Sequence, residues 1–528
     1  MMLAAMMALA GAAADPQDGS RLIDRNRIDR PRAPAPQLKP APPIERAKVK
    51  TSGTGRPIRG IRFRGAEAPR PVARAAEGFL GKPMTSETLA ELAGTLSRAY
   101  GRSNVALYTI AIPEQDFAND VVEVLLTEGR IAQVEIDAPR GKHKLLAARA
   151  GRMTTEEPLT RATFERQFTL IRAMPGLTVE PRFDDPQADG ALKLTLTPKQ
   201  KRRKISAGFS NRGVDLTGDG QFDLNAEFYG VAGEGDQLTF GLSSASDLRR
   251  YRYAAAGYQA PLTASGLTIA ANAAWLETRP RGFAGKGTAK LAGISLNYPL
   301  VRGFHRAADL SLGVDGINSD NAVLGNLIAT ERTRALRVAA GIADTRERRS
   351  WAVNAAASQG LDILGARVIE PFAEKRFRKV SGAASAAQAV GKGLTLRLNL
   401  SGQYSGDRLP AAERFAVGGE TLGRAFDTAF LTADKGAGAL GEVAVRPVKG
   451  GAFAASELYA FADRAWIGIA PRGVDPAIDL AMASAGFGGR VKFKEKAELG
   501  LEAATAIDDP YPAFDEDWRI SVRWKLSL

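Results

Sequence analysis

The last stretch of the chain, WRISVRWKLSL at residues 518–528, alternates strictly between apolar and polar side chains. The apolar set takes every second position and consists of Trp518, Ile520, Val522, Trp524, Leu526 and Leu528. Successive side chains of a β-strand point to opposite faces of its sheet. This period of two therefore predicts a strand with one apolar face and one cationic face.

The same alternation returns in other stretches after residue 204. QFDLNAEF at residues 221–228 and LTLRLNLS at residues 394–401 both place apolar side chains at every second position. Alternating segments of about ten residues, separated by turns rich in Gly, Asp and Asn, are typical of transmembrane β-barrels. A soluble β-sandwich also alternates, but its strands are shorter and hide their apolar faces in one shared core. We therefore favour a barrel.

The chain after residue 204 has room for about sixteen such strands, at roughly twenty residues for each strand with its connection. An even number of antiparallel strands in this range suits a bacterial outer-membrane barrel, which leaves an aqueous lumen unless a segment plugs it. Only 7% of the residues are aromatic. We therefore expect Ala, Val and Leu, rather than wide aromatic girdles, to form most of the lipid-facing surface.

Two copies of a small α+β unit precede the predicted barrel. Residues 56–129 predict the order strand, helix, helix, strand, strand, and residues 130–203 repeat that order. In the second helix of the first copy, Leu89, Leu92 and Leu96 recur at the three-to-four-residue spacing of an amphipathic helix. Tandem copies are a stronger signal than either copy alone. We call residues 56–129 module 1 and residues 130–203 module 2.

The N-terminal segment has features of targeting and linking sequences. Residues 1–14 are apolar and small and end in an A-x-A-like site, which is typical of a secretory signal peptide, although a positive n-region is missing. Residues 15–55 contain a Pro/Ala-rich stretch that favours an extended linker. Within them, residues 20–29 predict either a short polar helix capped by Ser20 or a disordered tail.

The composition excludes several classes of function. The 528 residues include no cysteine and two histidines, which excludes disulfide frameworks, thiolate metal sites and cysteine nucleophiles. The sequence contains no nucleophile elbow, phosphate-binding glycine loop or metal-ligand spacing. The net charge of +14 is spread along the chain, which argues against a nucleic-acid interface. We expect a protein that works by binding and passage, without catalysis, cofactor or metal.

Two tandem modules followed by about sixteen alternating strands resemble the two-partner secretion transporters, which export haemolysins and filamentous haemagglutinins. The resemblance covers residues 56–528. It implies an all-β transmembrane barrel of about 16 antiparallel strands, preceded by two periplasmic α+β POTRA domains. Residues 20–29 also resemble the N-terminal plug helix of that family. Its signature is an Arg-Gly-Tyr/Phe tripeptide in a lumen loop between strands eleven and twelve, whose arginine pairs with an aspartate on strand thirteen.

The letters of that signature occur in VRGF at residues 301–304, but at the wrong place. Roughly eleven strands would follow this stretch at the spacing of the chain, whereas five follow the signature in the family. The context NYPLVRGF instead resembles the family's Tyr-Pro-Leu-x-Arg hairpin near the middle of the barrel. Pro299 and Gly303 suit such a turn. We therefore interpret residues 301–304 as a turn.

LGRAF at residues 422–426 is the better candidate, because about a hundred residues follow it, enough for five strands. This choice assigns the lumen loop to about residues 408–437, with Arg424 and Phe426 as the signature residues. Ala425 stands where the family has glycine. The backbone of the loop here either needs no positive φ at that position or has a different shape.

Further residues are predicted to hold the lumen loop in one position, and we call this set of residues the lock. Its hinge is expected at three glycines: Gly418, Gly419 and Gly423. The family's F-x-D-x-G motif is matched by FADRA at residues 461–465, which supplies Asp463 and has Ala465 in place of glycine. The resemblance implies a buried, charge-assisted ion pair between Arg424 and Asp463. Such a pair would pin the loop, because leaving either charge unpaired is costly.

The resemblance also implies a function, that of a protein translocator in the bacterial outer membrane with its modules in the periplasm. An unfolded secreted exoprotein would bind the modules and leave through the pore without nucleotide hydrolysis. An extended segment of this cargo would add a strand to an open sheet edge of module 2. The candidate cargo-binding residues on its two candidate edge strands are Ile131, Val134, Thr178, Val179 and Phe183.

Two alternatives remain open from the sequence. An assembly factor that inserts other proteins into the outer membrane belongs to the same superfamily, and a passive porin with periplasmic adaptor domains also fits the pattern. Besides the cargo, we expect outer-membrane lipid as a partner. We expect no nucleic-acid partner and a monomeric barrel.

Overall fold

The computed structural model describes most of the chain from residue 47 onward. The residues outside this description are 1–46, 52, 139–142, 185–189, 215–216, 283, 324–325, 392, 449, 474–475 and 512–517. The predicted signal peptide, the predicted helix at residues 20–29 and most of the predicted linker lie outside the described residues. The chain divides into two compact units, one with the modules and one with the barrel.

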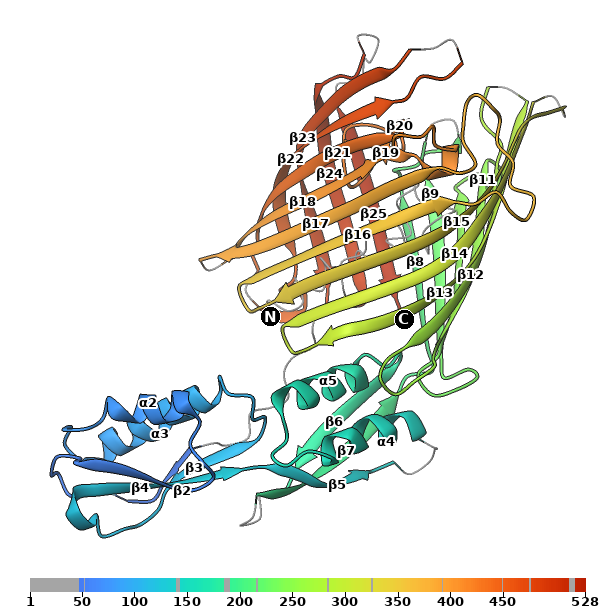
Figure 1. The fold of residues 1–528 in the computed structure, drawn as a ribbon. Helices are drawn as coiled ribbons and strands as arrows, with labels where there is room; N and C mark the ends of the chain where they lie inside the picture. Colours follow the sequence, from blue (N-terminus) through green and yellow to red (C-terminus); the bar gives the residue numbers. More distant parts are fainter. Residues whose placement is uncertain are drawn as a thin grey trace. The chain divides into compact units, whose positions relative to one another are not determined.

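Module 1 packs two helices against a four-stranded mixed sheet (Figure 1). Its elements are β1 (Ala47–Val49), β2 (Gly60–Gly65), α2 (Arg70–Glu77), α3 (Ser86–Tyr100), β3 (Tyr108–Ile112), η2 (Ala118–Asp120) and β4 (Val121–Glu128). Thr85 caps α3 by accepting a hydrogen bond from the N–H of Thr88, and Leu89 and Leu92 are fully buried. Strand β1 lies within the segment predicted as linker and joins the sheet beside β3, so the folded module begins before residue 56.

Module 2 has the same build with a three-stranded sheet. Its elements are β5 (Arg130–Ile136), α4 (Lys144–Gly151), η3 (Arg152–Thr154), α5 (Arg161–Arg172), β6 (Leu177–Phe183) and β7 (Ala191–Gln200). Strand β7 is central, parallel to β5 and antiparallel to β6, so β5 and β6 are the edge strands. Among the described helices, none combines the length and the hydropathy of a membrane-spanning segment.

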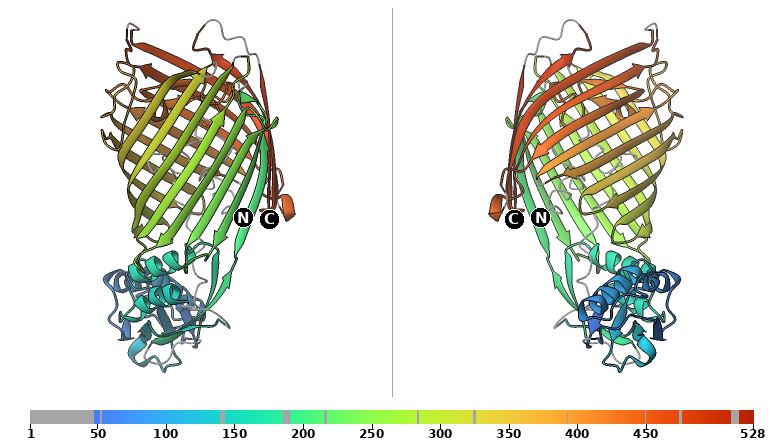
Figure 2. Two further views of the ribbon diagram at one scale, coloured as in Figure 1. Left: turned by 90° about the vertical axis from the view of Figure 1, so that its right-hand side faces the viewer. Right: turned by 90° about the vertical axis from the view of Figure 1, so that its left-hand side faces the viewer.

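Sixteen strands of the described chain close into an antiparallel barrel, which confirms the predicted fold class (Figures 1 and 2). The first eight are β8 (Arg203–Ser210), β9 (Gln221–Tyr229), β10 (Gln237–Ala245), β11 (Tyr251–Pro261), β12 (Thr268–Thr278), β13 (Gly285–Arg302), β14 (Arg306–Val323) and β15 (Asn326–Thr345). The others are β16 (Arg349–Gly360), β17 (Arg378–Val390), β18 (Leu394–Tyr404), β21 (Lys435–Val445), β22 (Glu457–Ile469), β23 (Ile478–Phe493), β24 (Ala497–Asp508) and β25 (Arg519–Ser527). Strand β25 pairs with β8 and closes the sheet.

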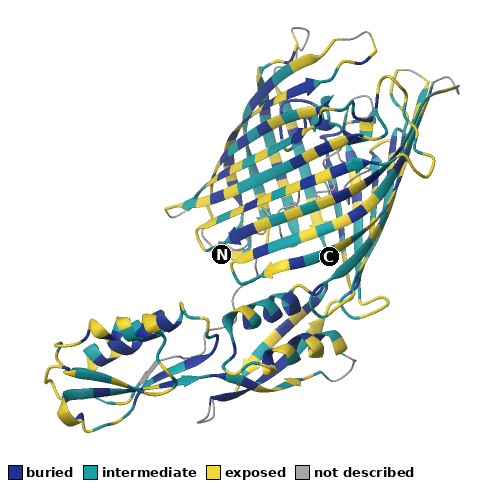
Figure 3. Ribbon diagram, in the orientation of Figure 1, coloured by how far each residue is buried: buried dark blue, intermediate teal, exposed yellow. Residues whose placement is uncertain are grey.

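Exposed and buried positions alternate along the barrel strands (Figure 3). On β18, Leu396, Leu398 and Leu400 are exposed on the outer wall, whereas Arg397 between them is 8% exposed on the inner wall. An apolar outer face and a polar inner face are what a closed barrel needs in lipid, because its backbone groups are all paired between strands. The period of two read from the sequence thus separates a lipid-facing side from a lumen side.

The two candidate signature stretches lie in different connections. Strand β13 ends at Arg302 and β14 begins at Arg306, so VRGF lies at a short turn between neighbouring antiparallel strands. The connection between β18 and β21, residues 405–434, is the longest inside the described barrel and packs against its inner wall. We call it the lumen loop. It contains η5 (Ala411–Glu413), β19 (Phe415–Val417) and β20 (Leu431–Ala433), and a further short helix, η6 (Gly451–Phe453), follows β21.

The division into lipid and lumen faces is testable on β18. Replacing Leu398 with Arg places a cation in the lipid-facing band, and we expect the free energy of unfolding to fall by about 2–4 kcal/mol. Urea unfolding of the barrel in lipid vesicles measures this change. The neighbouring substitution Asn399→Arg adds the same charge on the lumen side and should lower the free energy of unfolding much less. Equal losses for the two variants would contradict the assignment of faces.

Candidate functional site

The lumen loop is a hairpin whose tip carries the predicted signature. Strands β19 and β20 pair with each other, and residues 418–430 connect them; we call these residues the loop tip. Gly418 and Gly419 have φ of +101° and +106°, and Gly423 has φ of +68°. A Cβ atom on Gly418 would lie 2.1 Å from the carbonyl oxygen of Asp427. The three glycines predicted as a hinge thus occupy backbone conformations that other residues rarely adopt.

Two other residues of the tip are buried in an apolar core between the loop and the barrel wall. Phe426 is fully buried and packs on Phe430, with 5.4 Å between the ring centroids. Ala425 is 3% exposed and is not among the described residues with positive φ. The turn of the backbone falls one position before Arg424, at Gly423. Alanine can therefore replace the family's glycine, and its methyl group fills space in the core.

Asp463, 4% exposed on β22, holds the backbone of the tip. Its Oδ1 accepts from the N–H of Gly423 at 2.6 Å, and its Oδ2 accepts from the N–H of Arg424 at 3.3 Å. The hydroxyl of Ser484 on β23 also donates to Oδ2, at 2.6 Å. Hydrogen bonds to a carboxylate are charge-assisted and stronger than neutral ones. The structure thus brings Arg424 and Asp463 together through the backbone and not through the predicted side-chain ion pair.

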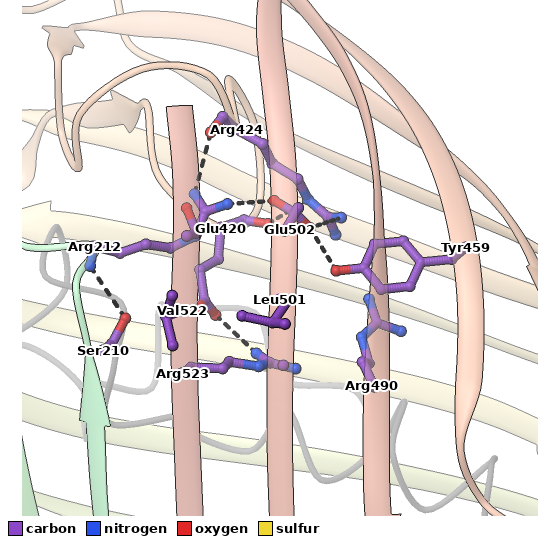
Figure 4. Close-up of a pocket in the computed structure, with 12 residues that line it drawn as sticks. Ser210, Arg212, Glu420, Arg424, Tyr459, Arg490, Leu501, Glu502, Val522 and Arg523 are labelled. Carbon is purple, nitrogen blue, oxygen red and sulfur yellow. Dashed lines mark hydrogen bonds and ion pairs between the residues drawn. The ribbon is translucent and has the colours of Figure 1, made fainter. Parts of the chain in front are cut away.

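The guanidinium of Arg424 points to other strands instead (Figure 4). Its Nη1 lies 3.0 Å from Oε2 of Glu502 on β24 and 3.5 Å from Oε2 of Glu442 on β21. Its Nε donates to the carbonyl oxygen of Glu420 at 2.9 Å. The guanidinium also covers the ring of Phe461 at 4.5 Å, a cation–π contact. The physical reason for the difference is the turn at Gly423, which aims two backbone N–H groups at Asp463 and the side chain away from it.

Arg212, which follows β8, joins the tip to the first strand of the barrel. Its guanidinium binds Glu502, and its Nη1 donates to the carbonyl oxygen of Arg424 at 3.2 Å. The carbonyl oxygen of Arg212 accepts from the hydroxyl of Thr428 at 2.7 Å. The site borders a cavity of about 50 Å³, which has room for water. The tip is therefore held by charged groups of strands that are far apart in the sequence.

Reasoning from the sequence missed Glu442, Glu502 and Arg212 because no local motif marks them. The available signal for Glu442 and Glu502 was their place on the polar side of alternating strands, which they share with many other charged residues. Arg212 follows β8 and carries no such signal. Among the described residues, no group of three or more His, Cys, Asp or Glu side chains is placed to hold a metal ion. The site is a network of hydrogen bonds and ion pairs that fixes a loop.

The candidate cargo-binding residues lie on the two edge strands of module 2. Ile131 and Val134 belong to β5, and Thr178, Val179 and Phe183 belong to β6. The side chains of Ile131 and Val179 are buried in the core of the module. Only their backbone groups are available to an added strand.

Comparison with known proteins identifies the family. The family of haemolysin secretion/activation proteins ShlB/FhaC/HecB matches residues 190–490, and the ShlB-type POTRA domain matches residues 56–129. The chain belongs to this family. Members of the haemolysin secretion/activation family are outer-membrane barrels with POTRA domains, which confirms the resemblance read from the sequence and the expected outer-membrane location.

One curated relative and two solved structures resemble the chain at low sequence identity. The heme/hemopexin transporter protein HuxB of Haemophilus influenzae strain 86-028NP is 21% identical over 178 residues, which are 33% of this chain and 32% of HuxB. The match thus spans about a third of the length of that relative. The structure of CdiB from Escherichia coli has a TM-score of 0.69 at 18% identity and covers 99% of both chains. CdiB from Acinetobacter baumannii gives 0.63 at 14%, covering 100% of this chain and 98% of that one.

The geometry of the lock predicts which pairs of side chains are energetically coupled. Arg424→Gln and Glu502→Gln should each loosen the tip, and their double mutant should show a coupling of about 1–3 kcal/mol, because the two groups contact each other. Arg424→Gln and Asp463→Asn should show a smaller coupling, because Asp463 binds backbone groups that remain in the variant. Subtilisin cleavage of the loop in the folded barrel measures each opening free energy. A larger coupling of Arg424 with Asp463 than with Glu502 would contradict this geometry and support the side-chain ion pair predicted from the sequence.

The glycines of the tip give a second prediction. Gly423→Ala should lower the free energy needed to open the tip by about 1–3 kcal/mol. The substitution puts a side chain at positive φ and a Cβ 2.8 Å from Cε of Met482. Ala425→Gly restores the family's letters, yet should weaken the tip by about 1 kcal/mol or less, because position 425 needs no glycine conformation. The same proteolysis assay compares them. A tighter loop in Ala425→Gly would show that the turn lies at position 425.

Proposed function

We propose that this chain is an outer-membrane protein translocator, which captures an unfolded secreted protein with its POTRA modules and exports it through the barrel. The observation that supports this most directly is the lumen loop. Its tip is held on the inner wall by hydrogen bonds and ion pairs that can break while the strands of the barrel stay paired. A segment held in this way can leave the path of a passing chain. A passive porin needs no such releasable segment.

Capture of the cargo has a candidate position at the edge of the module 2 sheet, and β6 is the less suitable edge. The N–H of Asp184 donates to the carbonyl oxygen of Lys193 on β7 at 3.1 Å. Backbone groups alternate in direction along an antiparallel strand, so those of Val179, Pro181 and Phe183 point away from β7. Pro181 has no N–H to offer an added strand. A proline on an edge strand is a common protection against further pairing.

Strand β5 is the better edge for an added strand. The N–H of Asp137 donates to the carbonyl oxygen of Leu196 on β7 at 3.0 Å, so the backbone groups of Val134 and Ile136 point away from the sheet. In the part of the chain that the structure describes, neither of these two N–H groups has a backbone acceptor. Main-chain hydrogen bonds do not depend on side-chain identity. An edge of this kind suits an unfolded cargo of varied sequence.

The other expected properties belong to the same proposal. The chain acts by binding and passage, and no reaction is assigned to it. Progress of the cargo comes from its folding outside the cell and not from nucleotide hydrolysis. We expect the barrel to work as a monomer, because the sixteen described strands close without leaving an edge to which a second copy could add a strand. Lipid surrounds it, and the apolar groove of about 370 Å³ on its outer wall, bordered by Phe453, Phe493 and Trp524, suits acyl chains.

Export in cells tests both the proposed translocator function and the assignment of cargo binding to the β5 edge. The assay follows a candidate cargo, a large repeat-rich secreted protein encoded beside this chain, into the medium. Val134→Pro removes an outward N–H from β5 and should lower export at least about tenfold, if strand addition drives capture. Val179→Pro is the matched control on β6 and should change export little. Folding of each variant is checked by its heat-modifiable migration in gels.

Other outcomes of that assay contradict the proposal. Normal export of the candidate cargo from cells that lack this chain would exclude the chain as its translocator. A loss of many other outer-membrane proteins in those cells would favour an insertion factor. Steady large conductance in planar bilayers, with no dependence on the lumen loop, would favour a porin. Equal export by the two proline variants would remove the assignment to β5 alone.

A further inference from the structure

The outer wall of the barrel carries arginines at one end of β15. On this strand, Leu336 and Val338 are exposed on the outer wall, whereas Arg337 between them is buried on the lumen side. Side chains of a strand alternate between its two faces. Arg334 and Arg332, at the next two even positions, therefore point outward with the leucine and the valine. They face the surroundings of the barrel and not its lumen.

The outward arginines of β15 lie at the extracellular boundary of the membrane. The chain enters the barrel at β8, directly after the periplasmic modules, and neighbouring strands alternate in direction, so the hairpin between β14 and β15 is extracellular. Arg334 precedes Asp344 by ten positions on the same face of β15. At about 3.3 Å per residue and a tilt of about 40°, these positions are about 25 Å apart across the membrane. That distance equals the height of the apolar band of such barrels, about 25 Å.

The connection between β16 and β17 adds a third arginine. The N–H of Arg332 donates to the carbonyl oxygen of Arg367 at 2.6 Å, and the N–H of Arg367 donates back at 2.8 Å. The two residues form an antiparallel bridge. Residues paired in this way have their side chains on the same face, so the exposed Arg367 also points outward. We call Arg332, Arg334 and Arg367 the outer arginine cluster.

The outer arginine cluster has an excess of positive charge. Arg332 lies 3.3 Å from Asp320 on β14, and both side chains are about one third exposed. The acceptors that the structure describes for the guanidinium of Arg334 are all neutral: the carbonyl oxygens of Ile317, Thr333 and Leu364, and Oδ1 of Asn318. These bonds hold the guanidinium in place without cancelling its charge. Three arginines and one carboxylate leave an excess of two positive charges.

Another outward arginine of the barrel shows the contrast. Arg464 on β22 is exposed on the outer wall, as its neighbour Trp466 is. Its Nη2 lies 2.7 Å from Oδ2 of Asp508 on β24. One cation and one carboxylate balance each other at this position. The excess of charge is therefore a property of the outer arginine cluster and not of every outward arginine.

Apolar side chains border the cluster above and below. Val314 and Leu336 lie opposite each other on β14 and β15 and are exposed in the apolar band, beside Arg334. Leu364, whose carbonyl oxygen binds Arg334 at 3.1 Å, is 80% exposed, and its neighbour Ile363 is also exposed. A surface with cations at the membrane boundary and apolar groups beside them fits an amphiphile with an anionic headgroup.

We propose that the outer arginine cluster binds the phosphate groups of a phosphorylated glycolipid of the lipid A type in the outer leaflet. The planar fork of arginine matches phosphate in a bidentate manner. Two phosphate groups on one headgroup complement the excess of two positive charges better than the single phosphodiester of a glycerophospholipid. The acyl chains then lie along Val314 and Leu336. This inference names one lipid class for the expected lipid partner, and it needs the barrel in its membrane but no export of cargo.

Binding of lipid A to the purified full-length chain in detergent tests the inference. Native mass spectrometry follows a titration with lipid A that carries two phosphates, and gives its apparent affinity. Arg334→Gln and Arg367→Gln should each weaken binding by about tenfold or more, because each removes a charge-assisted contact to phosphate. Arg334→Lys keeps the charge without the fork and should lose less. Arg464→Gln is the matched control and should bind as the wild type does.

Two further lipids test the class of headgroup. Lipid A with one phosphate and phosphatidylglycerol should each bind the wild-type chain about tenfold more weakly than lipid A with two phosphates, because each offers fewer charges to the cluster. Raising the salt concentration should weaken binding, since the contacts are exposed to solvent. Heat-modifiable migration in gels checks that each variant is folded. If Arg334→Gln does not fold, Arg367→Gln, in a connection outside the barrel sheet, carries the test.

Several results would overturn the inference. Wild-type affinity in both glutamine variants, or no binding of lipid A by the wild-type chain, would remove the cluster as a lipid site. An equal loss in Arg464→Gln would mean that any outward cation attracts the lipid. Equally tight binding of phosphatidylglycerol would contradict the glycolipid. Because these measurements contain no cargo, failure of the lipid site and failure of the proposed export are distinguishable.

Discussion

The contact between Asp463 and two consecutive backbone N–H groups is the interaction on which the arrangement of the lumen loop depends. Those groups belong to Gly423 and Arg424 and are buried at the inner wall. Buried N–H groups without an acceptor would be costly, so the carboxylate sets where the tip can rest. Once the turn at Gly423 is placed, the side chain of Arg424 can reach β21 and β24 but is directed away from Asp463. The charge network around Glu442 and Glu502 follows from that orientation.

The alternation of side chains along the barrel strands places the residues of this site on the lumen face. On β22, Phe461, Asp463 and Ala465 are alternate residues and therefore share the lumen face. One of them supplies a cation–π surface, one a carboxylate and one a small side chain in the apolar core. The same alternation places Leu458 and Trp466 on the outer wall, where they are exposed. A change of register by one residue would exchange these faces and remove the site.

Much of the fold could be predicted because it depends on regular patterns. Strand alternation indicated the closed barrel, and counting strands placed the loop at LGRAF and not at VRGF. The side-chain partner of Arg424 could not be predicted in this way. The F-x-D-x-G match is a local motif that contains Asp463, whereas Glu502 lies two strands after it in the chain. Which of the two carboxylates the Arg424 side chain reaches depends on the turn at Gly423, which the sequence pattern does not show. Strand β1 was missed for a similar reason, since three residues contain too little periodicity to identify a strand.

Shared carboxylates are consistent with a loop that is ordered and, as proposed, releasable. An apolar contact such as that of Phe426 stabilises the closed position, but it gives little geometric direction, whereas a charge pair gives direction at the cost of desolvation. With a single pair, release would leave one buried charge on the wall. With Glu442 bound by three arginines, the departing cation is replaced by neighbours that are already in place. The departure of the Arg424 side chain therefore leaves Glu442 paired, whereas departure of the tip backbone also takes two hydrogen-bond donors from Asp463. In the proposed export, a cargo that folds outside the membrane would supply about 5–15 kcal/mol, the stability of a folded domain.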